Sequence, residues 1–328
     1  MRFEKHIELQ YDYRSSLICR GLAMEKLIDL KAYPVQGVLP LLLKDKTTKK
    51  NIIWATDSYK DYGRNYQDQD PMFILDVCNH AEAILPRIAK TSKDQAARTR
   101  KKAEVFTPVW LCCQMNNYLD EDWFGRKDVF NILHADHTWD VNDNPIEFPK
   151  GKTWKKYVDS RRLEITCGEA PFLVSRYDAA SGELIVPPKR RIGLLDRKLR
   201  IVNENTTNKK DWTTWATRAF QSVYGYECQG DNLLIARINL LNTFVDYYSE
   251  RWNEIPPIKD LKTIVNVICW NIWQMDGLTD RVPAGKIQTV VENRLFDATA
   301  TDPDMTPYCK IQDWRAEHPV IFHELKNI

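Results

Sequence analysis

Hydrophobic residues in this 328-residue chain recur at helical spacing in some stretches and form β-rich runs in others. The helical spacing predicts helices, and the β-rich runs predict strands. We expect helices over 105–119, directly behind Gly168, and over 211–220, 232–248 and 261–270, and strands over 163–166, 222–227 and 271–275. Alternation of this kind predicts an α/β fold, with a mostly parallel sheet and helices on both of its faces.

The first ninety residues have a different, mixed pattern. An apolar run, a polar turn and a β-rich return predict a strand–turn–strand unit over 37–57, and helical spacing follows over 72–88. We therefore expect a small N-terminal α+β segment over 1–89 and a larger domain over 90–328. Within the larger domain we expect a loop over 120–150, a polar insertion over 182–200 and a strand–turn–strand tail over 308–328.

Basic residues gather in the stretch 90–108. They are Lys90, Lys93, Arg98, Arg100, Lys101 and Lys102. A solvated helix face accounts for such a run, and so does a strip that binds phosphates. The strip leads directly into the first site motif described below, which favours phosphate binding. The expected contacts to double-stranded DNA are then Arg98, Arg100, Lys101 and Lys102.

The composition of the chain restricts the kinds of binding and the cellular location that we expect for it. The chain has 47 basic and 45 acidic residues and a net charge of +2, so any DNA binding must use local patches. Its eight cysteines include no C-x-x-C pair, which argues against a zinc ribbon. The first residues have no apolar signal-peptide core, and no run of 18 apolar residues follows. We therefore expect no membrane association and a cytoplasmic location.

Four short motifs carry candidate chemistry. Thr107 can cap a helix that starts at Pro108, and a helix N-terminus suits a carboxylate. In LEITCGEAPFL, residues 163–173, a strand leads to a tight turn at Gly168, which lets a ligand approach the backbone. Glu227 ends the next strand and can accept both hydroxyls of a ribose. Asp276, before Gly277, follows the last strand and can accept from the exocyclic amine of adenine.

A carboxylate site, a backbone turn, a ribose acceptor and an adenine acceptor together match the parts of S-adenosylmethionine. Three of the four motifs end strands, and ligands of parallel sheets bind at the carboxyl ends of the strands. For Gly168, Glu227 and Asp276 the alternative is a structural role in a turn or at a strand end. Cys167 has no histidine placed nearby in sequence, and we expect it to be structural.

The order of these motifs resembles that of the adenine-N6 DNA methyltransferases of restriction–modification systems. EVFTP resembles their first cofactor box, LEITCGEAPFL the strand and glycine turn, VYGYECQGDNLLIARINLL the acidic strand end, and NIWQMDGL the adenine-binding box. The resemblance covers roughly residues 90–280. It implies a Rossmann-like core that uses S-adenosylmethionine to methylate a flipped adenine. The cofactor residues that it implies are Phe106, Thr107, Pro108, Thr166, Cys167, Gly168, Glu169, Pro171, Phe172, Glu227, Asp276 and Gly277.

The chain departs from this family in its cofactor loop and in its catalytic box. Glu169 stands where serine or asparagine is usual, and Pro171 where an aromatic residue or alanine is common. The family's Asp/Asn-Pro-Pro-Tyr/Phe box, which accepts the target amine, does not occur in the sequence. Three explanations account for the missing box. A second polypeptide supplies it, the reading frame is truncated, or the protein binds cofactor or DNA without methyl transfer.

Two further clusters allow other chemistry. Asp313, Glu324 and Lys326 lie on or after predicted strands in the pattern of a Mg²⁺-dependent nuclease. His134, Asp136, His137 and Asp140 have ligand atoms at close spacing for a loop metal site, although polar loops collect such residues freely.

Overall fold

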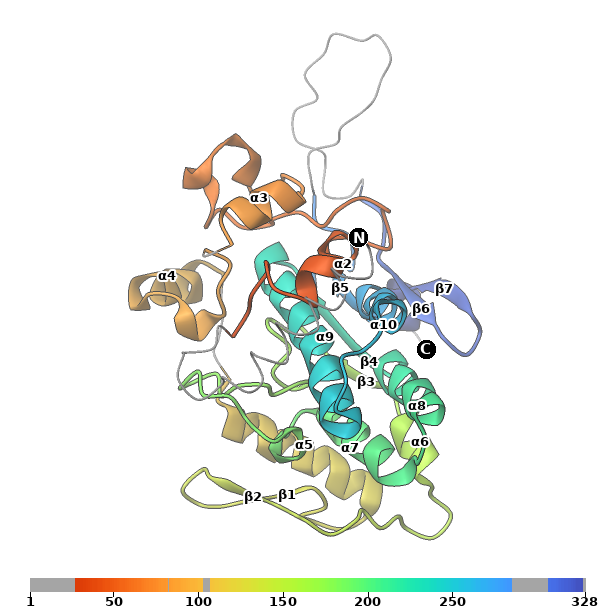
Figure 1. Cartoon of the computed structure of the whole chain (residues 1–328). Helices are drawn as coiled ribbons and strands as arrows, with labels where there is room; N and C mark the ends of the chain where they lie inside the picture. Colours follow the sequence, from red (N-terminus) through yellow and green to blue (C-terminus); the bar gives the residue numbers. More distant parts are fainter. Residues whose placement is uncertain (1–26, 82, 103–106, 285–305, 327–328) are drawn as a thin grey trace, which may run out of the picture.

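The computed structural model describes residues 27–81, 83–102, 107–284 and 306–326 (Figure 1). At its centre is a parallel sheet of three strands in the order β3-β4-β5, namely β3 (Arg162–Glu164), β4 (Val223–Glu227) and β5 (Ile272–Gln274). The middle strand, β4, is buried along its whole length. The predicted mixed α/β fold with parallel strands is therefore confirmed, and the three strands lie within two residues of their predicted bounds.

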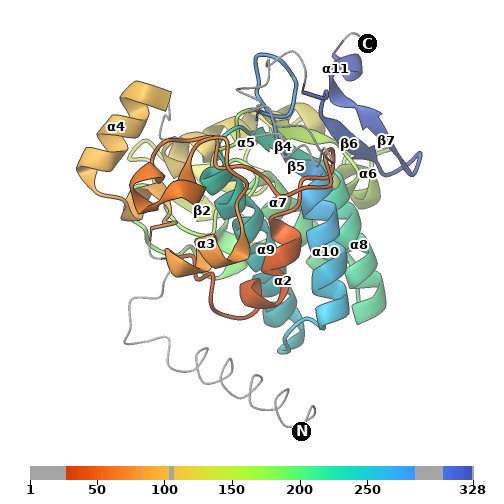
Figure 2. The same cartoon turned by 90° about the horizontal axis from the view of Figure 1, so that it is seen from above.

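Helices pack against one face of this sheet. They are α8 (Lys209–Gln221), α9 (Gly230–Trp252) and α10 (Ile258–Asn271), which contact β4, and α10 contacts both of the others. Figure 2 shows these helices side by side, with α2 (Val35–Leu42) against α10. All three long helices occur where their hydrophobic spacing predicts them, each a few residues longer at its ends.

The opposite face of β4 and β5 is covered by the C-terminal hairpin instead of a second helical layer. Tyr224 and Tyr226 on this face pack in one hydrophobic cluster with Ile311 and Phe322. These come from β6 (Lys310–Asp313), β7 (His318–Ile321) and the single helical turn α11 (Phe322–Leu325). The predicted tail hairpin is confirmed, whereas among the described residues no helix longer than the single turn α11 packs against this face of β4 and β5.

The prediction of an N-terminal α+β segment is wrong for both expected strands, since the return over 51–56 forms only isolated bridges at Asn51 and Ile53. Residues expected to form a strand are the helix α2, and its buried residues Val35, Val38, Leu39 and Leu42 have the spacing i, i+3, i+4, i+7. This spacing places all four on the face that packs against α10. The apolar composition of this short run suggests a strand, whereas the helical period of its hydrophobic residues is the feature that the structure follows. The following helix is also shorter than 72–88, since α3 spans only Ile74–Asn79.

Two predictions after Gly168 are also wrong. Residues 169–176 form turns and no helix. The stretch 182–200, expected to be a polar insertion, contains the start of α7 (Leu194–Asn205), which is buried over residues 194–202 despite its charges. Those charges have buried partners: Arg197 Nη1 lies 2.6 Å from Asp120 Oδ2, and Lys198 Nζ donates to Ser222 Oγ at 2.6 Å. Charged groups that are paired and hydrogen-bonded can be buried in a folded protein, whereas burial of an isolated charged group costs too much free energy.

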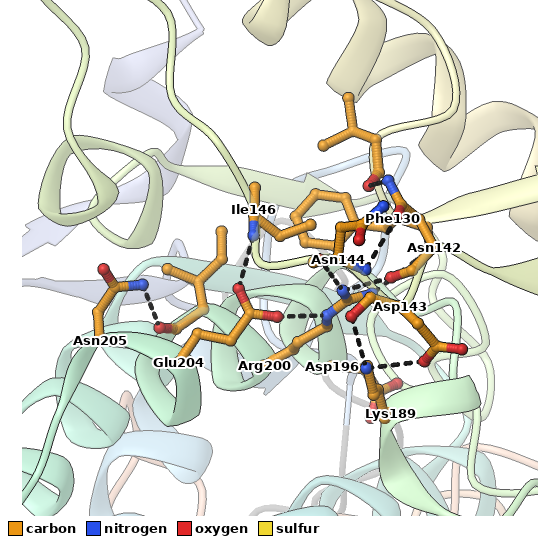
Figure 3. Close-up of polar contacts among 12 residues, drawn as sticks. Phe130, Asn142, Asp143, Asn144, Ile146, Lys189, Asp196, Arg200, Glu204 and Asn205 are labelled. Carbon is orange, nitrogen blue, oxygen red and sulfur yellow. Dashed lines mark hydrogen bonds and ion pairs between the residues drawn. The ribbon is translucent and has the colours of Figure 1, made fainter.

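Strands β1 (Asn131–Leu133) and β2 (Trp139–Val141) form a hairpin, and helix α7 forms hydrogen bonds with the segment 142–146 that follows it. The Arg200 guanidinium donates to the Asn142 and Asn144 carbonyls at 2.5 and 3.0 Å (Figure 3). Arg200 Nε also donates to Glu204, whose other oxygen accepts from the Ile146 amide at 2.9 Å. The predicted loop 120–150 thus contains the hairpin and, at its start, the end of α5 (Val109–Phe124). Two shorter helices, α4 (Ser92–Lys102) and α6 (Trp154–Val158), flank α5 in the chain.

The N-terminal segment shares the core of the larger domain. One hydrophobic cluster includes residues from both parts of the chain. The buried Arg237 of α9 donates to the carbonyls of Ile272 in β5, at 2.8 Å, and of Leu42 and Lys44. At Gly230, the first residue of α9, a Cβ would lie only 2.1 Å from the Ile53 carbonyl oxygen, so only glycine permits this approach. The expected boundary at 89/90 therefore does not separate two cores.

Replacing Arg237 tests this connection. We expect Arg237→Met to lower the free energy of unfolding by about 3 kcal/mol, because three carbonyls lose their donors. Urea denaturation monitored by tryptophan fluorescence measures the change. Arg100→Met on the exposed side of α4 is the matched control and should have little effect. An equally small effect for Arg237→Met would contradict the assigned connection.

Candidate cofactor site

A cavity of about 1010 Å³ lies at the carboxyl ends of the parallel strands. Its wall combines the loop after β3, the end of β4, the residues after β5, helix α5 and part of the N-terminal segment. Nine of the twelve predicted cofactor residues line it, namely Thr107, Thr166, Cys167, Gly168, Glu169, Pro171, Phe172, Glu227 and Gly277. Pro108 and Asp276 are not in the wall, and Phe106 lies outside the described residues. The fold thus brings together parts of all four motifs.

The loop after β3 has an unusual backbone. Gly168 has φ +53°, and a Cβ there would meet nothing within 4 Å, so the loop is open at this point. Thr166 and Ala170 also have positive φ, 45° and 65°. A left-handed conformation is uncommon for non-glycine residues and is a strong outlier for β-branched threonine. Such strain persists only where surrounding structure holds it, and it clusters at ligand sites.

Two buried carboxylates hold this loop. Glu227 accepts from the Gly168 and Gln229 amides, each at 2.9 Å. Glu164, at the end of β3, accepts from the Phe172 and Leu173 amides at 3.3 and 3.2 Å. Burial raises the pKa of Glu227, and it raises the pKa of Glu164 to about 8, although in both cases the amides act in the opposite direction. The sequence analysis does not predict this role of Glu164. The only feature that indicates it is an acidic residue between the apolar Leu163 and Ile165.

Glu169, the residue that departs from the family pattern, has a structural role. One carboxylate oxygen accepts from the Arg87 amide at 2.5 Å, and the other accepts from the Tyr177 hydroxyl at 2.6 Å. Glu169 therefore ties the loop to the N-terminal segment, and its negative charge is engaged by donors of this chain. Cys167 beside it is buried, and burial raises the pKa of its thiol well above the usual range. An inert thiol of this kind agrees with the structural role expected for Cys167.

Asp276 is a turn residue. Its carboxylate accepts from the Leu278 amide at 2.9 Å, and its carbonyl accepts from the Asp280 amide at 2.9 Å. Its two chain neighbours, Met275 and Gly277, line the cavity wall, whereas Asp276 itself does not. At the other end of the site, α5 begins at Val109 with Pro108 at the cap position and no side-chain cap, so the predicted capping by Thr107 is wrong.

The basic strip is only partly exposed. Arg98 is 5% exposed, and its guanidinium lies 2.9 Å from Asp231 Oδ2 and 3.2 Å from Gln229 Oε1. This residue is therefore engaged inside the protein and is not available to a phosphate. Arg100 is exposed on α4, whereas the side chains of Lys101 and Lys102 lie outside the described part. Sequence alone could not reveal Asp231 as the partner, because it lies 133 positions from Arg98.

The other candidate clusters are engaged separately. Asp313 accepts from Arg161 at 3.3 Å, Lys326 donates to Asp280 at 2.5 Å, and Glu324 lies in α11. His134 pairs with Asp140 at 2.9 Å, and the ring of His137 stacks on Trp110 at 3.9 Å. Among the residues that the structure describes, no group of three or more histidine, cysteine or acidic side chains is arranged to hold a metal ion.

The ion pair of Arg98 yields a test of this part of the site. Burial alone would raise the pKa of Asp231, but the charges of Lys90 and Arg98 outweigh it and lower the pKa. A carboxylate with a lowered folded-state pKa stabilises the fold above about pH 4, and this contribution is lost as the pH falls further. We expect Arg98→Met to cost about 3 kcal/mol at pH 7 and progressively less below pH 4, measured by urea denaturation. A loss that does not depend on pH would contradict the pairing.

The described helices include none that is long and apolar enough to cross a bilayer. No family model, curated protein or solved structure matches the chain.

Proposed function

We propose that this protein binds S-adenosylmethionine as the cofactor-binding part of a DNA adenine-N6 methyltransferase with a Rossmann-like core. The observation that carries the proposal is the cavity at the carboxyl ends of β3, β4 and β5, whose wall includes nine of the twelve residues that the four motifs and their resemblance indicate. Ligands of open parallel sheets bind at this end of the strands. The volume of about 1010 Å³ suffices for a nucleoside cofactor.

The catalytic step in this proposal belongs to a second polypeptide. The sequence has no Asp/Asn-Pro-Pro-Tyr/Phe box, so this chain by itself lacks the group that would accept hydrogens from the target amine. Strand β3 is an edge of the sheet, since in the described part it pairs only with β4. Leu163 in β3 and Ile165 directly after it are 46% and 64% exposed, and both also line the cavity. An exposed apolar strand edge is a template for pairing with another chain, which supports a partner at this place.

Cofactor binding is the first test. Isothermal calorimetry should detect binding of S-adenosylmethionine or S-adenosylhomocysteine to the wild-type chain. We expect Glu227→Gln to weaken binding at least tenfold, because the new amide group cannot accept from both the Gly168 and the Gln229 amides and the loop loses its geometry. Glu324→Gln, in the exposed turn α11, is the matched control and should bind as the wild type does. Absence of binding by a folded wild-type chain would contradict the proposed function.

Methyl transfer is the second test. We expect the isolated chain to bind the cofactor without transferring a radiolabelled methyl group to adenine in duplex DNA. Addition of a polypeptide that carries the missing box should restore transfer. Transfer by the isolated chain would show that the acceptor site lies within it, whereas binding without transfer under any combination would favour the alternative of a non-catalytic cofactor- or DNA-binding component.

A further inference from the structure

Lysines from three segments of the chain lie together on the surface around α10. Lys46 Nζ, in the turn after α2, donates to Asn266 Oδ1 of α10 at 2.7 Å, and Lys262 lies one helical turn before Asn266. The Lys310 amide, at the start of β6, donates to Thr47 Oγ1 of the same turn at 3.0 Å. We call the following residues the lysine surface: Lys44, Lys46, Lys49, Lys50, Lys259, Lys262 and Lys310.

The turn that carries four of these lysines has a defined shape. Lys44 and Asn51 form an antiparallel bridge at its base, and Arg237 Nη1 of α9 donates to the Lys44 carbonyl at 3.1 Å. Asp45 is 2% exposed and accepts from the Thr48 amide and hydroxyl, both at 2.6 Å. The single acidic residue of the stretch 44–50 is therefore used inside the turn, and it does not pair with the lysines outside.

The lysine surface has an excess of positive charge. Within the described residues, none of its members forms an ion pair, whereas Lys189 and Lys209 elsewhere pair with Asp143 and Glu254 at 2.8 and 2.5 Å. The net charge of the whole chain is only +2, so this excess is local. Cations that lie together without acids repel one another, and a bound polyanion relieves this repulsion.

Lys46 and Lys49 are the closest pair on this surface. Their ammonium groups lie 5.8 and 4.8 Å from the centroid of one ring, that of Trp270. Burial lowers the pKa of Lys46, the Cys269 thiol opposes this effect, and the charges of Lys49 and Arg237 add to it. The groups that act on Lys46 thus include two cations and no carboxylate.

The backbone at Lys49 is a second, independent observation. Its φ is +65°, a left-handed conformation that favours glycine or asparagine over a residue with a long side chain. A lysine at this position costs conformational energy, and no ion pair of the described chain offsets that cost. Strain of this kind is concentrated at functional positions.

A purely structural explanation covers only part of the surface. The C-terminal end of α10 has a partial negative charge, and the face of the Trp270 ring attracts cations, so both favour Lys46 and Lys49. Lys259 and Lys262 lie in the first turns of α10, where the helix dipole disfavours cations. These two lysines, which are exposed, therefore need another explanation.

We propose that the lysine surface binds the phosphate backbone of a double-stranded nucleic acid, in a contact region separate from the cavity. A duplex carries one negative charge about every 1.7 Å along its axis, and lysine ammonium groups bind phosphates as point charges. Such contacts position a duplex without reading its sequence. The inference does not depend on which ligand fills the cavity.

The position of the lysine turn allows one duplex to reach both regions. Ala55 lines the cavity wall, and only five residues separate it from Lys50. Five residues span at most about 18 Å, a length over which a duplex carries about ten phosphate charges. The lysine turn can thus serve the role for which the sequence suggested Arg98, whose guanidinium is engaged inside the protein.

Binding of the full chain to a short fluorescent duplex, measured by anisotropy over a range of salt concentrations, tests the inference. We expect Lys49→Asn/Lys50→Gln to raise the Kd about tenfold and to lower the slope of log Kd against log salt by about 2, because two phosphate contacts are lost. Asparagine tolerates the positive φ at position 49, so this variant should resist urea at least as well as the wild type. Lys127→Asn/Lys150→Gln, with the same change of charge at exposed sites outside the lysine surface, is the matched control and should bind as the wild type does.

Several outcomes would overturn the inference. They are absence of duplex binding by the wild type, an unchanged salt slope in the Lys49→Asn/Lys50→Gln variant, and an equal loss of affinity in the control. Duplex DNA and duplex RNA are measured separately to identify the source of the backbone. Tighter binding to polyglutamate or to phosphatidylserine vesicles than to either duplex would also overturn it. The same variant should bind S-adenosylmethionine as the wild type does in calorimetry, so failure of the cofactor test and failure of this inference are distinguishable.

Discussion

The hydrogen bonds from the loop amides to two buried carboxylates are the constraint on which the cavity depends. Glu164 and Glu227 end adjacent parallel strands, and between them they accept the amides of Gly168, Phe172 and Leu173. The loop can therefore keep its strained turns only while the register of the sheet holds both acids in place. The shape of the cavity therefore depends on how the strands pair, and the fold sets this shape without a bound ligand.

Buried charge joins segments that are distant in sequence throughout this protein. Arg98 binds Asp231, Arg197 binds Asp120, and Arg237 binds carbonyls of β5 and of the N-terminal segment. Removal of one partner leaves an uncompensated group in a medium of low polarity, which is far more costly than the net contribution of the intact pair. These contacts therefore specify which segments meet more than they add to stability.

Sequence alone predicted the elements whose hydrophobic pattern decides their structure. Helices α8, α9 and α10 and the buried strands are of this kind, and the cavity residues follow from motifs at the ends of strands and at the start of a helix. Helix α7 was missed because its charges are satisfied only by residues far away in the chain, such as Asp120. The burial of Arg98 depends in the same way on a partner, Asp231, that no local pattern reveals. The period of the hydrophobic residues and the position of a residue at a strand end can be read from neighbouring residues. The hydrogen-bond partners of a buried polar group cannot, because they come from distant parts of the chain.

The bond from the Arg87 amide to Glu169 has a consequence for how the chain behaves as a whole. Arg87 and Ile88 belong to the N-terminal segment and form part of the cavity wall. Anything that fills the cavity therefore binds both parts of the chain at once and favours the state in which they are joined. By mass action, occupancy of the cavity and attachment of the N-terminal segment are linked equilibria, so each strengthens the other.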